Sequence, residues 1–424
     1  MFGALFGGAS RRDRRDAVLF QGFGWDSCQK GGWYTKLKQQ LPELKAAGVT
    51  HLWLPPPSHS VSPQGYMPGQ LYNLEASKYG GKKELKELTS AAKKQGIACV
   101  ADVVINHRCA DIQENGVYNH YSDDTDHKGR RIDWGRWAIT CDDPHFNGSG
   151  NRDTGADYAA APDLDHANPE LRAALRDWLH WLQHDIGFEG WRLDFVKGYA
   201  PKFVDEYVSS TVGAAALNVG EFWVDMEWQG GELAADQDRA RQVLCDWVNA
   251  NNKSCSAFDF PLKGVLQEAA KRTQYWRLRD ARGKAPGLVG WWPEHAVTFV
   301  DNHDTGSSQQ HWPFPSHLVG VGYAYILTHP GIPCVFYEHF FDWGEELRGT
   351  IKGLLEVRRR AGIKAGARLD IRAAEADFYF AVVDGRVAVK LGPRLDMGPH
   401  LPRAEDGWQQ VAAGTEFCVW EKKK

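Results

Sequence analysis

The sequence predicts an α/β fold: a (β/α)8 TIM barrel with an inserted irregular domain after strand 3 and a C-terminal antiparallel β-sheet domain. Three observations lead to this prediction. Eight apolar, strand-like runs alternate with helical stretches, one long polar segment interrupts the alternation, and the tail has the pattern of a β-hairpin. The expected parts are an N-terminal tail (1–15), the barrel (16–106 and 167–362), the inserted domain (107–166) and the C-terminal domain (363–424).

The predicted barrel strands are short and rich in β-branched and aromatic residues. They occupy residues 17–23, 50–54, 97–104, 190–195, 216–221, 256–260, 296–300 and 332–337. Helices are predicted between them at 33–47, 82–95 and 169–185, the last with Asn168 as N-cap and Pro169 at its first position. An open, doubly wound sheet is the competing fold, but no Gly-x-Gly-x-x-Gly follows the first run.

Two segments depart from the alternation. Residues 107–166 are rich in Asp, Asn, Gly and His, and so long a loop in a compact domain is usually functional or a small domain of its own. In the tail, residues 377–383 and 386–391 flank Asp384-Gly385, which is a typical hairpin turn sequence.

Composition narrows the class of partner. The 424 residues are 43% hydrophobic and 25% charged, with a net charge of −4 and no long basic run. Nucleic acid and anionic membranes are therefore unfavourable partners, and we expect a neutral substrate. We also expect the chain to act as a monomer. The 18 tryptophans exceed ordinary usage, and while most should pack in the core, a minority at loop positions would suit sugar binding.

The N-terminus and the cysteines bear on location. The first ten residues form a short, Gly-rich apolar patch with its basic residues after it, which is not the order of a secretory signal. We expect an intracellular protein, with the chloroplast or another plastid among its compartments. Eight irregularly spaced cysteines without a Cys-x-x-Cys pair predict neither a zinc site nor a disulfide framework.

Carboxylates follow three of the predicted strands, at Asp194, Glu221 and Asp304. Active sites of such barrels lie at the C-terminal strand ends. Glycosidic cleavage requires one ionised and one protonated carboxyl group. Asp194 lies two residues after Arg192 and should be ionised, whereas Glu221 has no arginine beside it in sequence and should be the acid. A single such carboxylate is more often a cap or ion-pair partner; three beside Arg and His are harder to explain in that way.

Four motifs in order carry a family resemblance: residues 102–107 (DVVINH), 190–198 (GWRLDFVKG), 220–221 (GE) and 299–304 (FVDNHD). With them the chain resembles the plant-type α-amylases of glycoside hydrolase family 13 from about Val18 to Trp420. Cys109 makes it more similar to the intracellular, plastid-type branch than to the secreted cereal enzymes. The resemblance implies endo-hydrolysis of α-1,4 bonds in starch and other α-glucans with retention of configuration.

The resemblance also implies roles for individual residues. Asp194 would be the nucleophile, Glu221 the acid/base and Asp304 the carboxylate that stabilises the transition state, with ~5–5.5 Å between the carboxyl groups of Asp194 and Glu221. The implied substrate-binding residues are Tyr66, His107, Arg192, Lys197, Trp223, His303 and Trp312. Trp291 and Trp292 match a pair that binds starch at the surface in some relatives. A second such site in the C-terminal domain is expected to be absent, because Leu395 follows Gly392-Pro-Arg394.

Calcium is the implied cofactor. From the residues alone, the Asp-rich part of the insertion reads as a solvated acidic loop, since it is no EF-hand. The family's first calcium ion corresponds here to Asn106, Asp153, the Ala156 carbonyl, Asp163 and the Gly198 carbonyl. A second ion is expected at Asp142, Asp157 and Asp163, and a third is not, because residues 115–131 depart from the pattern. A regulatory disulfide involving Cys109 or Cys141 is a further hypothesis.

Two other functions remain open. A transglycosylase of the same clan would share the four motifs and differ in whether water or a sugar attacks the intermediate. A starch-binding protein that has lost catalysis is disfavoured, since all three carboxylates are present. A nicotinamide-dependent barrel enzyme would have no use for these carboxylates.

Overall fold

Eight parallel strands close into a barrel in the computed structural model, which describes residues 14–423. Their order is β1-β13-β12-β11-β8-β7-β3-β2, so each strand lies beside its neighbours in sequence and β1 closes on β13. The strands are β1 (Leu19–Gln21), β2 (His51–Leu54), β3 (Ala98–Val103), β7 (Gly190–Leu193), β8 (Val219–Gly220), β11 (Ser256–Phe258), β12 (Ala296–Phe299) and β13 (Ile332–Phe336). Each lies inside one of the eight predicted runs, which confirms the predicted fold class. The interpretation of residues 1–13 as a tail without a secretory signal lies outside the described residues.

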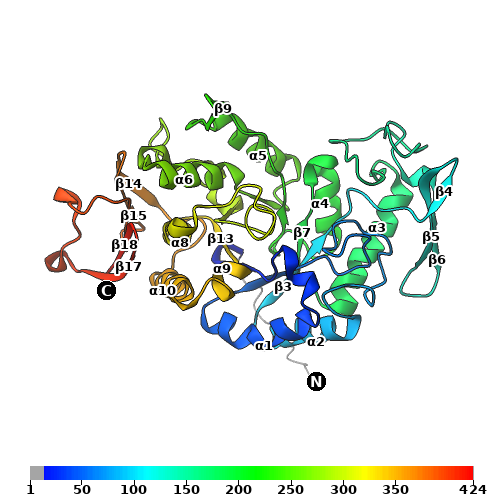
Figure 1. Cartoon of the computed structure of the whole chain (residues 1–424), viewed down its shortest axis with the longest axis horizontal. Coiled ribbons are helices and arrows are strands. Elements are labelled where there is room, and N and C mark those ends of the chain that lie inside the picture. The colour runs from blue at the N-terminus through cyan, green and yellow to red at the C-terminus, as the bar shows by residue number, and fades with distance from the viewer. Residues whose placement is uncertain (1–13, 424) are drawn as a thin grey trace, which may run out of the picture.

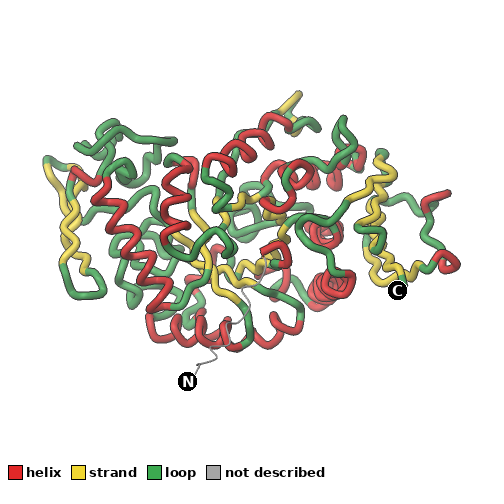
Figure 2. The backbone as a smooth tube through the Cα atoms, turned by 180° about the vertical axis from the view of Figure 1, so that it is seen from behind, coloured by secondary structure: helices red, strands yellow, loops and turns green. Residues whose placement is uncertain are grey.

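Helices surround the barrel, as the ribbon and the tube show from opposite sides (Figures 1 and 2). Asn168 caps α3 by accepting a hydrogen bond from the Glu170 amide at 2.9 Å, and Pro169 is its first residue. The helix then widens into a π-turn, Leu182–Ile186, and ends at Gly187, whose φ of 95° is readily available to glycine. The helices are α1 (Trp33–Ala46), α2 (Lys82–Lys94), α3 (Pro169–Trp181), α4 (Pro201–Ser210), α5 (Asp238–Ala250), α6 (Phe260–Arg272), α7 (Leu288–Trp291), α8 (Val319–Thr328), α9 (Tyr337–Phe341) and α10 (Glu345–Ala361).

The segment between β3 and α3 is only partly irregular. It contains a three-stranded antiparallel sheet of β4 (Ile112–Glu114), β5 (Val117–Thr125) and β6 (Arg131–Trp134). The rest of the segment returns to the barrel, where bridges pair His107 with Asp163 and Ile139 with Leu164. A smaller hairpin, β9 (Trp228–Gln229) and β10 (Glu232–Leu233), follows β8.

The C-terminal part is a five-stranded antiparallel sheet in the order β14-β15-β16-β18-β17. Its central hairpin turns at Asp384 and Gly385, whose φ angles of 49° and 66° suit the predicted turn. One face, including Tyr379 and Val389, joins the barrel core, and the other covers a small core around Phe380 and Trp420. The strands are β14 (Leu369–Ala374), β15 (Tyr379–Val383), β16 (Val387–Leu391), β17 (Trp408–Gly414) and β18 (Phe417–Lys422). This sheet and the segment that follows β3 lie at opposite ends of the molecule (Figure 1).

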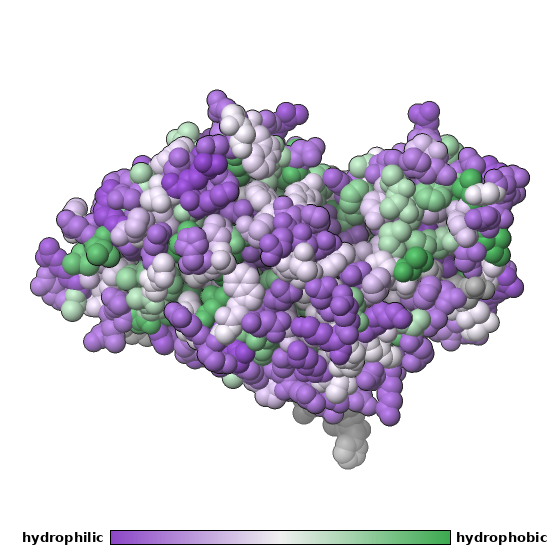
Figure 3. Space-filling view, viewed as in Figure 1, coloured by the Kyte–Doolittle hydropathy of each residue, from purple (hydrophilic) through white to green (hydrophobic). Residues whose placement is uncertain are grey.

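The surface and the cysteines complete the description. Hydrophilic residues cover most of the face seen in Figure 3. Between residues 14 and 423, none of the helices combines the length and the apolar character needed to cross a membrane. All eight cysteines are free, with Cys109 half-buried and Cys141 exposed.

Candidate active site

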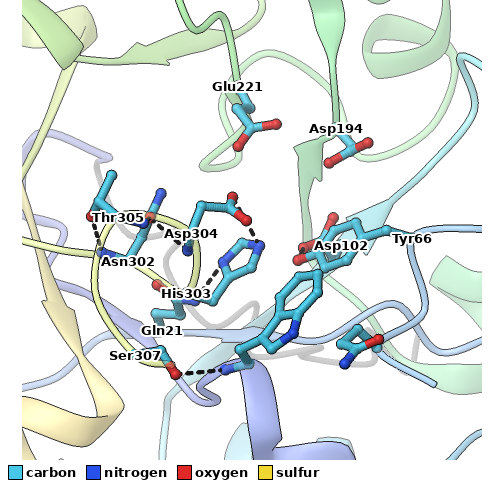
Figure 4. A network of polar contacts seen from close by, with 12 residues as sticks. Gln21, Tyr66, Asp102, Asp194, Glu221, Asn302, His303, Asp304, Thr305 and Ser307 are labelled. Carbon is cyan, nitrogen blue, oxygen red and sulfur yellow. Dashed lines mark hydrogen bonds and ion pairs between the residues drawn. The ribbon is translucent and has the colours of Figure 1, made fainter. Parts of the chain in front are cut away.

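Three carboxylates converge at the C-terminal end of the barrel. Asp194 follows β7, Glu221 follows β8 and Asp304 lies in the loop after β12. Because these strands are parallel, their C-terminal ends open on the same face. Figure 4 shows the three side chains pointing toward a common space. Only 11% of each of the Asp194 and Glu221 side chains is exposed, against 22% of Asp304.

A fully buried arginine holds this arrangement together. Arg192 Nη1 donates to Asp102 Oδ1 at 2.8 Å and to Asp194 Oδ1 at 2.6 Å. Its Nη2 forms an ion pair with Glu221 Oε1 at 2.7 Å. Glu221 has no arginine beside it in sequence, but the fold brings Arg192 to it. β7 and β8 are adjacent and parallel, so the end of one strand brings its side chains against the end of the next, although the residues are distant in sequence.

Burial raises the pKa values of both carboxyl groups. It raises the pKa of Glu221 to about 8 and that of Asp194 to about 6, although the Arg192 charge opposes the rise at both groups. At neutral pH Glu221 therefore keeps its proton while most of Asp194 is ionised. Burial acts on both groups, but Asp194 also accepts a side-chain hydrogen bond from Arg192 that lowers its pKa, so Asp194 is the more acidic of the two.

The backbone after β7 also aims at Glu221. Phe195 has a φ of 44°, which is uncommon for a residue other than glycine and strained for a bulky side chain. In this conformation its amide donates to Glu221 Oε2 at 3.4 Å. Phe195, the residue that follows Asp194, thus contacts the carboxyl group of Glu221.

His303 connects Asp304 to the barrel interior. Its Nε2 lies 3.3 Å from Asp304 Oδ2, and its Nδ1 lies 2.9 Å from the Gln21 amide nitrogen. Since that nitrogen can only donate, the ring proton belongs on Nε2, where it faces Asp304. Burial lowers the pKa of His303 to about 4, so the ring is neutral at neutral pH. The Tyr66 ring stacks on it at 5.0 Å, and the Tyr66 hydroxyl donates to Asp102.

The other predicted substrate-binding residues on this face are packed against protein groups. His107 is 1% exposed, its Nε2 lies 2.9 Å from the Tyr66 carbonyl and its ring stacks on Tyr158 at 3.9 Å. The Trp223 ring stacks on Phe260 at 4.8 Å. The Lys197 ammonium lies 5.3 Å from the Phe195 ring. Trp312 is half-buried, with the Lys263 ammonium 4.8 Å from its ring.

Trp291 and Trp292 lie elsewhere. They precede β12 and therefore belong to the end of the barrel opposite the carboxylates. Both are half-buried, with the Arg241 guanidinium 4.0 Å from the Trp291 ring and the Lys253 ammonium 5.6 Å from the Trp292 ring. The structure does not bring this pair to the active site.

Several predicted calcium ligands lie together beside the active site. Asn106 Nδ2 donates to Asp163 Oδ1 at 2.9 Å, while Asn106 Oδ1 is buried without a hydrogen-bond partner. A Cβ atom on Gly198 would come within 2.0 Å of that oxygen, and one on Gly155 within 2.6 Å of the Gly198 carbonyl oxygen. Burial, followed by the negative charge of Asp153, raises the pKa of Asp163 to about 8. An unpartnered amide oxygen beside a buried carboxylate fits a hard cation.

The remaining predicted ligands adjoin this group. The Ala156 amide donates to the Lys197 carbonyl at 2.9 Å, which places residue 156 beside Gly198. Asp157 contacts Asp163, and the Asp153 amide donates to Asp142 at 2.8 Å. No three His, Cys, Asp or Glu side chains of residues 14–423 form an arrangement that could hold a metal ion. An ion here would thus depend on amide and carbonyl oxygens as well as carboxylates.

Sequence reasoning gave no role to several residues of the site, although Asp102 opens one of the four motifs. Asp102 bonds to Arg192 and to Tyr66, and Gln21 bonds to His303. Both stand in predicted strands, and a polar residue within an apolar run is a signal that could have identified them. Trp25, whose ring is parallel to Tyr66 at 6.2 Å, has no comparable signal because it begins a short 3-10 helix outside the predicted strands.

Comparison with known proteins agrees with this geometry. Residues 29–339 match the family of α-amylase catalytic domains. The chain belongs to the α-amylase family. Residues 360–421 also match the α-amylase C-terminal β-sheet domain, which corresponds to the five-stranded sheet.

Two plant members of the α-amylase family are 43% identical to this chain. The Arabidopsis thaliana "Probable alpha-amylase 2" aligns over 97% of the chain and 95% of its own length. "Alpha-amylase 3, chloroplastic", from the same plant, aligns over 95% of the chain but 44% of its own length, so the chain spans less than half of that protein. These matches confirm the resemblance to plant α-amylases. A solved Anoxybacillus α-amylase shares the fold, with 17% identity, a TM-score of 0.66 and coverage of 97% of this chain and 99% of that chain.

Proposed function

We propose that the chain hydrolyses internal α-1,4-glucosidic bonds of starch and related α-glucans and retains the configuration at the anomeric carbon. The observation that carries this proposal is the pair Asp194 and Glu221, joined by Arg192 and differing in pKa, at the active end of an α-amylase barrel. The plant relatives at 43% identity are named as α-amylases.

The reaction would proceed in two displacements. The Asp194 carboxylate attacks the anomeric carbon while Glu221 gives its proton to the departing glycosidic oxygen, which leaves a covalent glycosyl-enzyme. Glu221 then takes a proton from water, and the hydroxide attacks the same carbon and frees Asp194. This sequence requires ~5–5.5 Å between the two carboxyl groups. Asp304, whose Oδ2 lies 3.3 Å from His303 Nε2, would bind the sugar hydroxyls and stabilise the positive charge of the transition state.

We assign the sugar contacts as follows. Tyr66 would stack on the sugar at the cleaved bond, with Arg192, His107 and His303 orienting carboxylates or hydroxyls there. Lys197, Trp223 and Trp312 would line neighbouring subsites. Trp291 and Trp292 would form a separate starch-binding surface, which requires the two cations beside them to leave part of each ring accessible.

We also propose that calcium binds where the inserted segment meets the barrel. Asn106, Asp153, Asp163 and the carbonyls of Ala156 and Gly198 would hold one ion, and the unpartnered Asn106 oxygen supports this assignment. An ion held there would supply positive charge to the crowded carboxylates, and its ligands would tie the segment to the residues next to His107 and Asp194. We do not extend the proposal to the second ion expected at Asp142, Asp157 and Asp163, because no three acidic side chains of residues 14–423 are arranged to hold one.

The broader assignments are proposals of the same kind. We place the domain boundaries at 16–106 with 167–362 for the barrel, 107–166 for the insertion and 363–424 for the C-terminal sheet. The chloroplastic relative supports an intracellular, plastid location. Starch and α-glucan oligosaccharides are the expected partners. We expect the chain to be a monomer, and its molar mass from light scattering in solution would test this.

The decisive test compares reducing-end release from soluble starch by the wild-type chain and by Glu221→Gln. We expect rapid release by the wild type and a fall in kcat of about 10²–10⁴-fold in the variant, because the amide cannot act as an acid. Glu346→Gln, an exposed change in α10, should retain wild-type activity. A fully active Glu221→Gln would contradict the site. A wild type that releases no reducing ends in calcium would favour a transglycosylase or a starch-binding protein instead.

A further inference from the structure

A buried lysine stands behind the catalytic loop. Lys263 lies in the first turn of α6, which follows β11 directly, and is 1% exposed. Its ammonium lies 3.3 Å from Asp301 Oδ1, donates to the Trp312 carbonyl at 2.6 Å and also donates to Gln267. One cation on a helix of the barrel wall therefore contacts the loop after β12 near both of its ends.

Asp301 carries this contact through the loop. Its carboxylate accepts hydrogen bonds from the Thr305 hydroxyl at 2.9 Å and from the Phe314 amide at 3.1 Å. The Asn302 amide donates to the Thr305 hydroxyl at 3.0 Å. The Asn302 side-chain oxygen accepts from the Asp304 amide, also at 3.0 Å. Asp304 is thus held by a short chain of bonds that ends at Asp301 and Lys263.

The loop also fixes Trp312 against α6. The Trp312 ring lies so near Gly264 that a Cβ atom there would come within 2.5 Å of it. The Trp312 amide donates to the Thr305 carbonyl at 3.2 Å, and the His311 amide donates to the Asp304 carbonyl at 3.1 Å. The position of Trp312 is therefore linked to that of Asp304.

The charge of Lys263 has no substitute in this environment. Asp301 is 2% exposed, and a buried carboxylate without a cation is strongly destabilising. His339 Nε2 lies 3.7 Å from Asp301, but burial lowers the pKa of His339 to about 4, so its ring is neutral at neutral pH. Burial lowers the pKa of Lys263 to about 8, which still leaves it protonated at neutral pH.

We propose that Lys263 is a positioning residue: through Asp301 and the Trp312 carbonyl it holds the loop 301–314 so that Asp304 meets the substrate. The inference rests on the proposed function, because it assigns a purpose to the placement of Asp304. A lysine that only stabilised the barrel would affect the melting temperature without affecting turnover.

The test measures kcat and KM on soluble starch together with melting temperature for Lys263→Met, Asp301→Asn and the double variant. Assays are run well below the lowest melting temperature. We expect kcat to fall about 10- to 100-fold in Lys263→Met, because misplacing a catalytic group by about 1 Å has effects of this size. The double variant should lose no more kcat than the single variant with the larger loss, because both changes release the same loop.

Lys390→Met is the matched control. Lys390 is a second buried lysine, 5% exposed, whose ammonium bonds to the Gly392 carbonyl in the C-terminal sheet. Its replacement should lower the melting temperature and leave kcat within about twofold. If Lys263→Met behaves in the same way, or if the losses in the double variant multiply, the proposal is wrong.

Thr305→Val keeps the test decisive if Lys263→Met does not fold. It removes the hydroxyl between Asp301 and Asn302 and leaves the ion pair intact. We expect kcat to fall about 10-fold or more. Unchanged turnover in this folded variant would overturn the proposal. An inactive wild type would instead overturn the proposed function.

Discussion

The protonation of the site depends on a single side chain, Arg192. Its guanidinium is completely buried and contacts Asp102, Asp194 and Glu221, so three carboxyl groups share one positive charge. One charge cannot stabilise three buried anions, and at least one group must keep its proton. Glu221, whose pKa is raised furthest above its ordinary value, is the group that does so. Burial, which the one shared positive charge only partly offsets, therefore maintains a general acid at neutral pH.

This cluster predicts a bell-shaped pH profile of kcat/KM. Both pKa values are raised, to about 6 for Asp194 and about 8 for Glu221. Activity should fall as the pH drops through about 6, since protonated Asp194 cannot attack, and fall again above about 8, since ionised Glu221 cannot donate a proton. The limbs belong to the coupled cluster rather than to isolated residues. Initial rates on soluble starch, with circular dichroism at each pH as the control for unfolding, would test this; a constant rate from about pH 7 to 10 would contradict it.

At the residue scale, the sequence predicts which groups matter better than it predicts their partners. Asp194, Glu221 and Asp304 stand out because they follow apolar strands. The contact between Arg192 and Glu221 cannot be predicted in this way, since it joins the ends of two strands and exists only once the barrel closes. The role of Lys263 was not predicted either, because in sequence it is one of many lysines on helices.

At the scale of elements, the loop that contains Gly155 lies close against the backbone of Gly198 and Tyr199. A Cβ atom on Gly155 would lie 2.3 Å from the Gly198 carbonyl carbon, so Gly155→Ala must push residues 153–157 away from the barrel. We expect calcium to raise the melting temperature of this variant less than that of the wild type. Gly349→Ala is the control: no atom lies within 4 Å of the added carbon on α10, and removing a helix glycine should stabilise the protein by about 0.5–1 kcal/mol. Equal calcium effects in both variants would argue against a site at this loop.

Helix α3 offers a prediction that separates stability from catalysis. Asn168→Ala removes the side-chain oxygen that accepts the Glu170 amide. Losing such a cap should lower the free energy of unfolding by about 1 kcal/mol. The cap bond involves none of the three carboxylates, so kcat should not change. Denaturant unfolding gives the first quantity and a starch assay the second. An unchanged unfolding free energy would show that the cap contributes nothing, and a changed kcat would show that α3 communicates with the site.

Helices and strands were predictable where the hydrophobic residues follow a single helical or strand periodicity. All eight barrel strands lie within predicted apolar runs, and the helices α1 and α2 end within one residue of the predicted positions. The sheet formed by β4, β5 and β6 was not foreseen, because its strands carry Asp, Asn and Arg and bury few side chains. The π-turn that ends α3 has no signature in the hydrophobic pattern, which continues through it.

For the whole molecule, the proposed calcium site is the joint between the barrel and its insertion. The bridge between His107 and Asp163 and the bond between Asn106 and Asp163 join the two parts beside the catalytic face. The residues on the barrel side, Asn106 and Gly198, directly adjoin elements of the active site. Loosening this joint should therefore affect both stability and activity.

Calcium should accordingly stabilise the protein more as the pH rises. Without the ion, burial raises the pKa of Asp163 from 3.8 to about 8 in the folded chain. The unfolded chain loses this proton near pH 4 while the folded chain retains it, so the metal-free protein loses stability as the pH rises from about 4 to about 8. Calcium requires the ionised carboxylate and restores that stability. The increase in melting temperature between chelator and calcium should be small near pH 5 and large near pH 8, and activity should follow it. Asp163→Asn should abolish the difference, whereas an equal increase at both pH values would show that Asp163 is not a ligand.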